Sequence, residues 1–259
     1  MKTVKEYLPF LEKALAYTTR STYFVSQPHL RDLFKDHSNL IFVANHSTPL
    51  SWLPTICLLG TETARNGGEN RTPIGVMDKF FFEWPVFKPL SEFLTQSAVL
   101  WSFDEILDRL NNSENLDLML FPEGSNCFFG EPSEIQNFRS PRFIELSIMT
   151  QTPVVIVVHE GSENWATALD VGEKLVPLTQ YFPNYVQKKI DETGILTMPL
   201  IPFTIEAFKM TCAIYRPTMT KDDLSDDLPT RKQQIREEAE KVREFMQKMQ
   251  VKLKQIQPV

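Results

Sequence analysis

Two residues of this sequence, a histidine and a glutamate, combine reactive side chains with positions directly after apolar segments. His46 follows the apolar run 40–43, and Glu123 follows the apolar run 116–121. A neutral imidazole accepts protons near pH 7, so His46 is suited to take the proton of an attacking hydroxyl or amine. The next residue after Glu123 is Gly124, which permits a tight turn with exposed amides that would bind an oxyanion.

These two segments are expected to meet at one edge of a sheet. Uniformly apolar strands are typical of parallel sheets buried on both faces, and ligands bind beyond their carboxyl ends. Predicted strands are 40–43, 73–77, 98–101, 116–121 and 153–158, with 200–206 and 212–215 as a further strand pair. Predicted helices between them are 51–59, 85–95, 103–111 and 141–150. The pattern predicts an α/β fold with a largely parallel central sheet flanked by helices.

Both ends of the chain carry helical patterns. Residues 3–18 form an amphipathic pattern, and residues 230–257 predict a long helix with a heptad-like apolar seam. That seam either packs on the helix's own domain, which we favour, or joins two copies in a homodimer. No Gly/Ser-rich or Pro-rich linker divides the 259 residues, so we expect one domain over 1–259, with its motifs at about 39–160.

The motifs and their order resemble the glycerolipid acyltransferase superfamily of the lysophosphatidate acyltransferase type. Asn45 and His46 match its first block, 121–124 (Phe-Pro-Glu-Gly) matches its third, and Pro153, which opens a strand, matches its fourth. The segment 138–141 resembles the Phe-Lys-x-Gly of that family. The resemblance implies transfer of an acyl chain from acyl-CoA or acyl-carrier protein to a hydroxyl of a lyso-phospholipid-like acceptor. It implies no metal and no further cofactor, and it makes His46 the general base.

Three places in the sequence depart from the family pattern in ways that bear on mechanism. Ser51 stands where the family has an aspartate, and Ser125-Asn126 stands where it has Thr-Arg. The segment 96–102 also lacks the arginine of the second block. The family's arginines hold the acceptor's phosphate, which suits charged donors. The candidates to replace them are Arg139, Arg142 and Lys79.

Ser51 is predicted to act on the imidazole of His46 without supplying charge. A carboxylate fixes the imidazole tautomer and stabilises the imidazolium, whereas a serine only accepts the hydrogen bond. We expect the difference to lower the rate by roughly 10²–10³, unless another carboxylate such as Asp78 or Asp104 intervenes. The alternative for Ser51 is a plain N-cap of the helix that begins at Trp52.

The candidate site therefore comprises a catalytic pair and a substrate-binding set. His46 and Ser51 are the catalytic pair. The predicted substrate-binding residues are Asn45, Glu123, Gly124, Ser125, Asn126, Arg139 and Arg142. The remaining histidines, His29, His37 and His159, lie outside these motifs and are interpreted as structural.

Two other classes of function compete with acyl transfer. Because Ser51 replaces the aspartate and arginines are missing, a non-catalytic lipid- or acyl-binding protein is the alternative. A metal-dependent phosphoesterase is rejected, since 44–47 has no acidic neighbour for the histidine. A serine hydrolase is unsupported, because no Gly-x-Ser-x-Gly sequence occurs.

Composition bounds the partners and the location. With 33 acidic and 27 basic residues the formal charge is −6, so no footprint for nucleic acid is present. No signal-peptide pattern and no long uncharged apolar stretch are found, which predicts a cytoplasmic protein, peripheral at the membrane surface. The aromatic segment 80–87 is either core or an apolar ridge that enters lipid. The cysteines are interpreted as reduced thiols.

Overall fold

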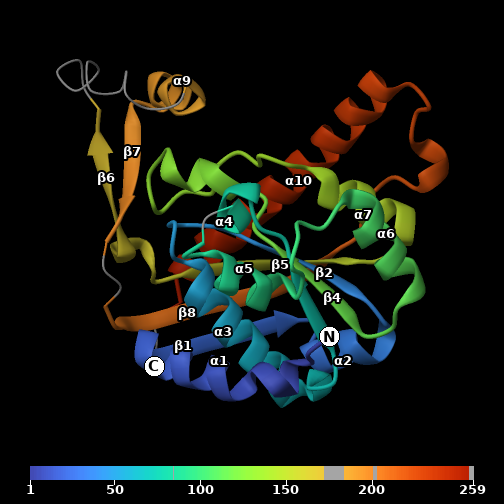
Figure 1. Cartoon of the computed structure of the whole chain (residues 1–259), viewed down its shortest axis with the longest axis horizontal. Coiled ribbons are helices and arrows are strands. Elements are labelled where there is room, and N and C mark those ends of the chain that lie inside the picture. The colour runs from blue at the N-terminus through green and yellow to red at the C-terminus, as the bar shows by residue number, and fades with distance from the viewer. Residues whose placement is uncertain (84, 172–183, 201–202, 257–259) are drawn as a thin grey trace.

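The protein is an α/β structure built on one mostly parallel sheet. The structure, a computed structural model, describes residues 1–83, 85–171, 184–200 and 203–256 (Figure 1). The central sheet has six strands in the order β1-β8-β5-β2-β4-β3, and neighbours are parallel except β5 and β8. Its strands are β1 (Thr19–Gln27), β2 (Leu40–Ala44), β3 (Thr72–Gly75), β4 (Leu116–Leu120), β5 (Val154–Glu160) and β8 (Ile205–Tyr215).

Helices cover both faces of this sheet. In Figure 1, α1, α2 and α3 lie on one face, and α6, α7 and α10 lie on the other. A separate two-stranded sheet pairs β6 (Ala166–Asp170) with β7 (Ile195–Pro199). The helices are α1 (Val4–Thr18), α2 (Leu30–Asp36), α3 (Trp52–Thr63), α4 (Lys79–Glu83), α5 (Lys88–Thr95), α6 (Phe103–Asn112), α7 (Arg142–Thr150), α9 (Asn184–Thr193) and α10 (Leu228–Lys254).

The continuous apolar runs of the central strands are buried on both faces, as predicted. In β2, Ile41 and Val43 join the core cluster on the α10 side. Leu40 and Phe42 of the same strand join the cluster on the α1–α3 side. Because alternate residues of a strand point to opposite faces, a sheet covered twice needs apolar residues at every position.

The predicted strand at 98–101 is wrong. This segment is a bend after α5, and Val99 is 62% exposed. The indole of Trp101 donates to the carbonyl of Thr95 at 2.9 Å, which folds the segment back on the end of α5. A run of apolar residues therefore lies at the surface here, beside the helix end, instead of in the sheet.

The two late apolar runs form one strand and not a pair. β8 spans Ile205–Tyr215 and pairs with β1 on one side and β5 on the other. The polar residues Lys209 and Thr211 interrupt the apolar pattern, yet both are in register with neighbouring strands. Residues 201–202 of the predicted run 200–206 lie outside the described residues. The sequence patterns also missed β1, α2, α9 and the β6–β7 sheet.

The apolar faces of the two terminal helices are both buried in this domain. Val4, Tyr7, Leu11 and Leu15 of α1 are buried, and α1 packs on α3. The apolar seam of α10 belongs to the core of the same chain, which confirms intramolecular packing; its buried members are Ile235, Ala239, Val242, Met246, Met249 and Leu253. The homodimer remains a prediction, and residue 257 of the predicted helix lies outside the described residues.

Two further sequence expectations concern chemistry and membranes. Cys57, Cys127 and Cys212 are free and buried, in agreement with reduced thiols. Across the described ranges, no helix combines the length and the apolar character that crossing a bilayer requires.

Candidate active site

The candidate site lies at the carboxyl edge of the parallel strands β2, β4 and β5. His46 follows β2 and Glu123 follows β4, and these two strands are parallel neighbours. The backbone N–H of His46 donates to Oε1 of Glu123 at 2.6 Å. The structure therefore brings together the two residues that the sequence singled out, as expected for loops at one edge of a parallel sheet.

The hydrogen bonds around Ser51 determine which ring nitrogen of His46 carries the proton. Nδ1 of His46 lies 3.1 Å from Oγ of Ser51. The hydroxyl of Ser51 donates its single proton to the carbonyl of Thr48 at 2.8 Å. Since that proton is used, Nδ1 must be the donor toward Oγ, and Nε2 then carries the lone pair.

Nε2 of His46 is the nitrogen available for chemistry. No hydrogen bond joins it to any residue that the structure describes, and His46 as a whole is partly exposed. The ring packs on Phe121, with 5.0 Å between ring centroids. The lone pair of Nε2 thus lies at the sheet edge, beside the ring of Phe121. A general base requires such an unpaired lone pair.

Ser51 does not act as an ordinary N-cap. It occupies the N-cap position of α3, but its side chain makes no capping bond to the helix. Its Oγ instead accepts from the backbone N–H of Thr48 at 3.3 Å and contacts His46. Ser51 is fully buried, so this geometry is held by the protein rather than by solvent.

The imidazole of His46 is neutral at physiological pH. Burial lowers the pKa of His46 to about 4, and the nearby carbonyl of Thr48 opposes this shift. Within the described contacts, no carboxylate hydrogen bonds to the ring. Asp78 pairs instead with Arg139, and Asp104 lies exposed in the first turn of α6.

Glu123 is a buried support for the His46 loop, whereas the sequence placed it among the predicted substrate-binding residues. Its side chain is fully buried, and burial raises the pKa of Glu123 to about 7. Oε1 accepts from the amide of His46, and Oε2 accepts from the amide of Gln136 at 2.6 Å. Both carboxylate oxygens thus accept hydrogen bonds from backbone amides, so the geometry favours a positioning role for this side chain.

Replacing Glu123 by glutamine is expected to destabilise the fold by about 2 kcal/mol. The glutamine presents an NH₂ group to one of the two backbone amides, which leaves two donors facing each other in a buried place. Urea unfolding at pH 8 measures the free energy of unfolding. The exposed Glu134→Gln is the matched control, and equal stabilities of the two variants would contradict this role for Glu123.

The turn that follows Glu123 is tied to the segment 137–139. Gly124 has φ +52°, a left-handed conformation that favours glycine, and its N–H donates to the carbonyl of Phe121 at 3.0 Å. That amide is therefore used within the turn and is not free for an oxyanion. Asn126 donates from Nδ2 to the carbonyl of Asn137 at 2.8 Å. Both residues shape the turn.

Arg139 is the predicted cation that the structure places beside the turn after Glu123. Its Nη1 lies 3.0 Å from Oγ of Ser125 and forms an ion pair with Asp78. Its side chain is 52% exposed, so it can reach an incoming ligand. Arg142 instead lies over the ring of Phe103 on α6, 4.6 Å from its centroid. Among the described contacts, none connects Arg142 with His46 or Glu123.

Asn45 forms a buried connection with His159, a residue that the sequence patterns left out of the site. The amide of His159 donates to Oδ1 of Asn45 at 2.9 Å, and Nδ2 of Asn45 donates to the carbonyl of His159. Nε2 of His159 lies 2.9 Å from the carbonyl of Asn45. These bonds fix the residue before His46 against β5. The sequence signal that could have placed His159 in the site is its position, because it directly follows the predicted strand 153–158, as His46 follows the run 40–43.

Apolar side chains are exposed in the loops before, between and after α4 and α5. Val76, Val86, Val99 and Leu100 are 38%, 79%, 62% and 41% exposed. Phe81 and Phe87 stack edge to face within this segment, at 5.7 Å between ring centroids. The segment 80–87 is thus neither fully core nor fully surface, and its residue 84 lies outside the described residues.

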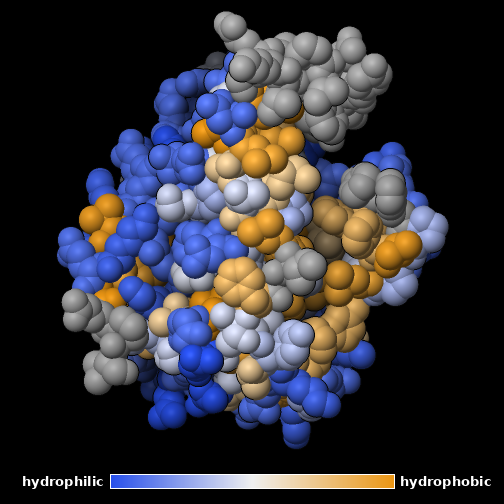
Figure 2. Space-filling view, turned by 90° about the vertical axis from the view of Figure 1, so that its left-hand side faces the viewer, coloured by the Kyte–Doolittle hydropathy of each residue, from blue (hydrophilic) through white to orange (hydrophobic). Residues whose placement is uncertain are grey.

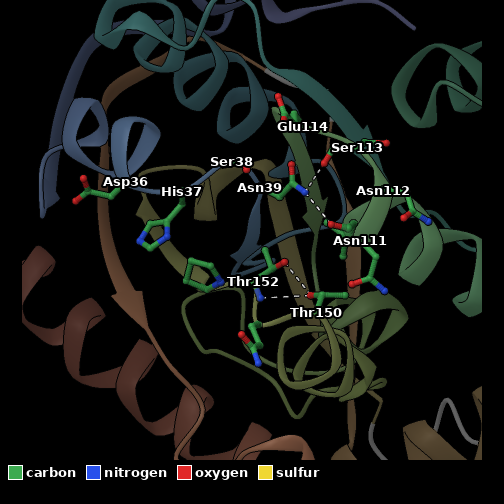
Figure 3. A pocket seen from close by; sticks show the side chains of 13 residues that line it. Asp36, His37, Ser38, Asn39, Asn111, Asn112, Ser113, Glu114, Thr150 and Thr152 are labelled. Carbon is green, nitrogen blue, oxygen red and sulfur yellow. Dashed lines mark hydrogen bonds between the residues drawn. The ribbon is translucent and has the colours of Figure 1, made fainter.

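A polar hollow of about 440 Å³ lies elsewhere on the molecule (Figure 3). It is lined by segments 36–39, 110–114 and 150–153. The first and last of these precede β2 and β5, so the hollow lies at the amino edge of the sheet, opposite His46. Its lining of asparagines, hydroxyls and His37 takes no part in the cluster around Glu123.

Comparisons with known proteins leave the family open. No family model matches the sequence, and no curated protein matches it. The resemblance to glycerolipid acyltransferases therefore rests on the motif residues alone.

Proposed function

We propose that the chain is an acyltransferase similar to the glycerolipid acyltransferases, in fold as in motifs. It transfers an acyl chain from acyl-CoA or acyl-carrier protein to a hydroxyl of a lyso-phospholipid-like acceptor. The observation that carries the proposal is the ring of His46, which is neutral, protonated on Nδ1 by its bond with Ser51, and unpaired at Nε2 within the described residues. A base in this state accepts a proton from an attacking hydroxyl.

The transfer converts a thioester into an oxygen ester. The acceptor oxygen attacks the thioester carbonyl carbon while its proton moves to Nε2 of His46. The tetrahedral intermediate then collapses, the C–S bond breaks, and the sulfur leaves with the proton that the imidazolium returns. Ser51 holds the Nδ1–H throughout, so the ring keeps one orientation. The products are the acylated lipid and a free thiol.

The acceptor and the location follow from the surroundings of His46. Arg139, half exposed beside Ser125, is suited to a polar or anionic headgroup. The exposed apolar loop residues around α4 and α5 favour work at a membrane surface, and we propose that this is a cytoplasmic one. Only the acyl thioester is required as a co-substrate.

One observation favours a second candidate, a lipid- or acyl-binding protein without catalysis. Within the described residues no carboxylate hydrogen bonds to the ring of His46, and the low pKa of this ring makes it a weak base. Product formation separates the two proposals. We expect mass spectrometry to detect a new acyl ester when the protein is mixed with acyl-CoA and a panel of lyso-lipids. Absence of ester with every acceptor would favour the binding protein.

His46 is expected to add no acidic limb to the pH profile of acyl transfer between about pH 5 and 8. Burial lowers the pKa of His46 from 6.5 to about 4, so the ring stays in its neutral form down to that value. Burial raises the pKa of Glu123 to about 7, so this carboxyl is the site group that titrates within the window. Profiles of kcat/KM against pH for the wild type and Glu123→Gln separate the two groups. An acidic limb near pH 6.5 that persists in Glu123→Gln would contradict this prediction, because it would come from an imidazole that is freely solvated.

A further inference from the structure

The small β6–β7 sheet has an apolar face on its outer side. Leu169 is paired with Leu196 across the two strands, and Thr167 is paired with Met198. Paired residues, and residues two apart on a strand, point to the same face of a sheet. These four residues therefore form one face, which we call the outer arm face, and none of them is charged.

The opposite face of this sheet packs on the body of the protein. Thr197 is fully buried, and its hydroxyl donates to the carbonyl of Gly130, just after the turn that follows Glu123. The outer arm face is thus turned away from the protein. Leu169 is 45% exposed and Met198 is 42% exposed. A solvated sheet face is normally polar, so this one is expected to have a partner.

The β6–β7 sheet, called the arm, and the exposed loop residues around α4 and α5 border the same region. This region is the turn after Glu123 and the loop that follows it. Thr197 of β7 contacts Gly130. Asp78, directly before α4, pairs with Arg139, and the same guanidinium contacts the hydroxyl of Ser125. Figure 2, which views the molecule from the side of β6 and β7, shows apolar side chains gathered in a band across this face. A partner that covers both apolar areas must be broad.

We propose that the outer arm face inserts into the surface of a lipid bilayer. A bilayer is broad and apolar below its headgroups, which matches the apolar outer arm face and the exposed apolar loop residues around α4 and α5. Lys188 and Lys189 of α9, next to the arm, share one carboxylate, Glu192, so one positive charge of the pair is left over at the level of the lipid phosphates, and the side chain of Lys188 is 78% exposed. The inference deepens the proposed function, because it names the surface through which a lipid acceptor reaches His46.

Vesicle co-sedimentation of the full chain tests this inference. We expect the wild-type protein to bind phosphatidylcholine vesicles, and the double variant Leu169→Ser/Met198→Ser to bind about tenfold more weakly, since two apolar side chains no longer leave water. The matched control Leu228→Ser/Val251→Ser removes two apolar residues of similar exposure, 64% and 59%, from α10. It is expected to bind like the wild type.

Three outcomes would overturn the inference. These are no vesicle binding by the wild type, equal binding by the arm variant, or a dimer in gel filtration that the arm variant converts to a monomer. The last result would assign the face to a second copy of the chain. Failure of the proposed function is separate. If the wild type binds vesicles through the arm yet forms no acyl ester, the surface stands and the catalytic proposal falls.

Discussion

Replacing His46 by alanine is expected to lower the rate of acyl transfer by about 10³. General-base catalysis contributes roughly 10²–10⁴, and Nε2 of this ring is the proton acceptor in the mechanism. The loss should appear in kcat, because the ring acts on the proton and its own contact with the acceptor is small. Release of free thiol from acyl-CoA, followed in the presence of a lyso-lipid, measures it.

The matched control is His29→Ala, which removes an exposed imidazole before α2, outside the candidate site. It should keep the wild-type rate. If His46→Ala and the wild-type protein release thiol at equal rates while both are folded by circular dichroism, His46 is not the base. The proposal would then lose its catalytic residue.

Replacing Ser51 by aspartate is expected to raise the rate by about 10². Oγ of Ser51 lies 3.1 Å from Nδ1 of His46, so a carboxylate at this position reaches the same nitrogen. Its negative charge stabilises the imidazolium that forms in the transition state, and in serine proteases the corresponding carboxylate is worth about 10⁴ in rate. The same charge raises the pKa of His46, so the acidic limb of the pH profile moves toward neutral pH.

Ser51→Asn controls for size and hydrogen bonding without charge. It should not raise the rate, since an amide cannot stabilise the imidazolium and does not impose the tautomer. A large fall in activity for a folded Ser51→Asp protein would mean that the transferred proton is handled by another group. Equal rates for the aspartate and asparagine variants would remove the electrostatic explanation.

Sequence reasoning predicted the part of the fold that is encoded by strong, uniform patterns. β2, β4 and β5 are continuous apolar segments, and each has the expected position in a sheet covered on both faces. β1 escaped detection because its residues are mostly polar or partly exposed at the sheet edge. Polar edge strands are stabilised by pairing with their neighbours, which a local pattern does not record.

The strand predicted at 98–101 fails for the converse reason. Val99 and Leu100 are apolar but exposed, since the segment bends at Gln96, whose backbone is left-handed. Apolar character alone does not distinguish a buried strand from a surface segment that meets something else. The outer arm face shows the same limit, because its residues acquire a common direction only through the pairing of β6 with β7.

The residues of the candidate site were predicted from the sequence, but the separate role of each residue was not. The proximity of His46 to Glu123 followed from their places after parallel strands. That Glu123 supports backbone amides, and that Asn45 is locked to His159, depends on which way each side chain turns at the sheet edge. Such orientations arise from tertiary hydrogen bonds and have no sequence period.

The measurement that tests the central claim most directly is ¹⁵N NMR of the histidine side chains in the purified protein. At pH 7 we expect the ring of His46 to be neutral and to carry its proton on Nδ1, and we expect no titration of this ring between about pH 5 and 8. A proton on Nε2, or a positively charged ring at pH 7, would leave no lone pair facing the acceptor. Either result would contradict the role assigned to His46.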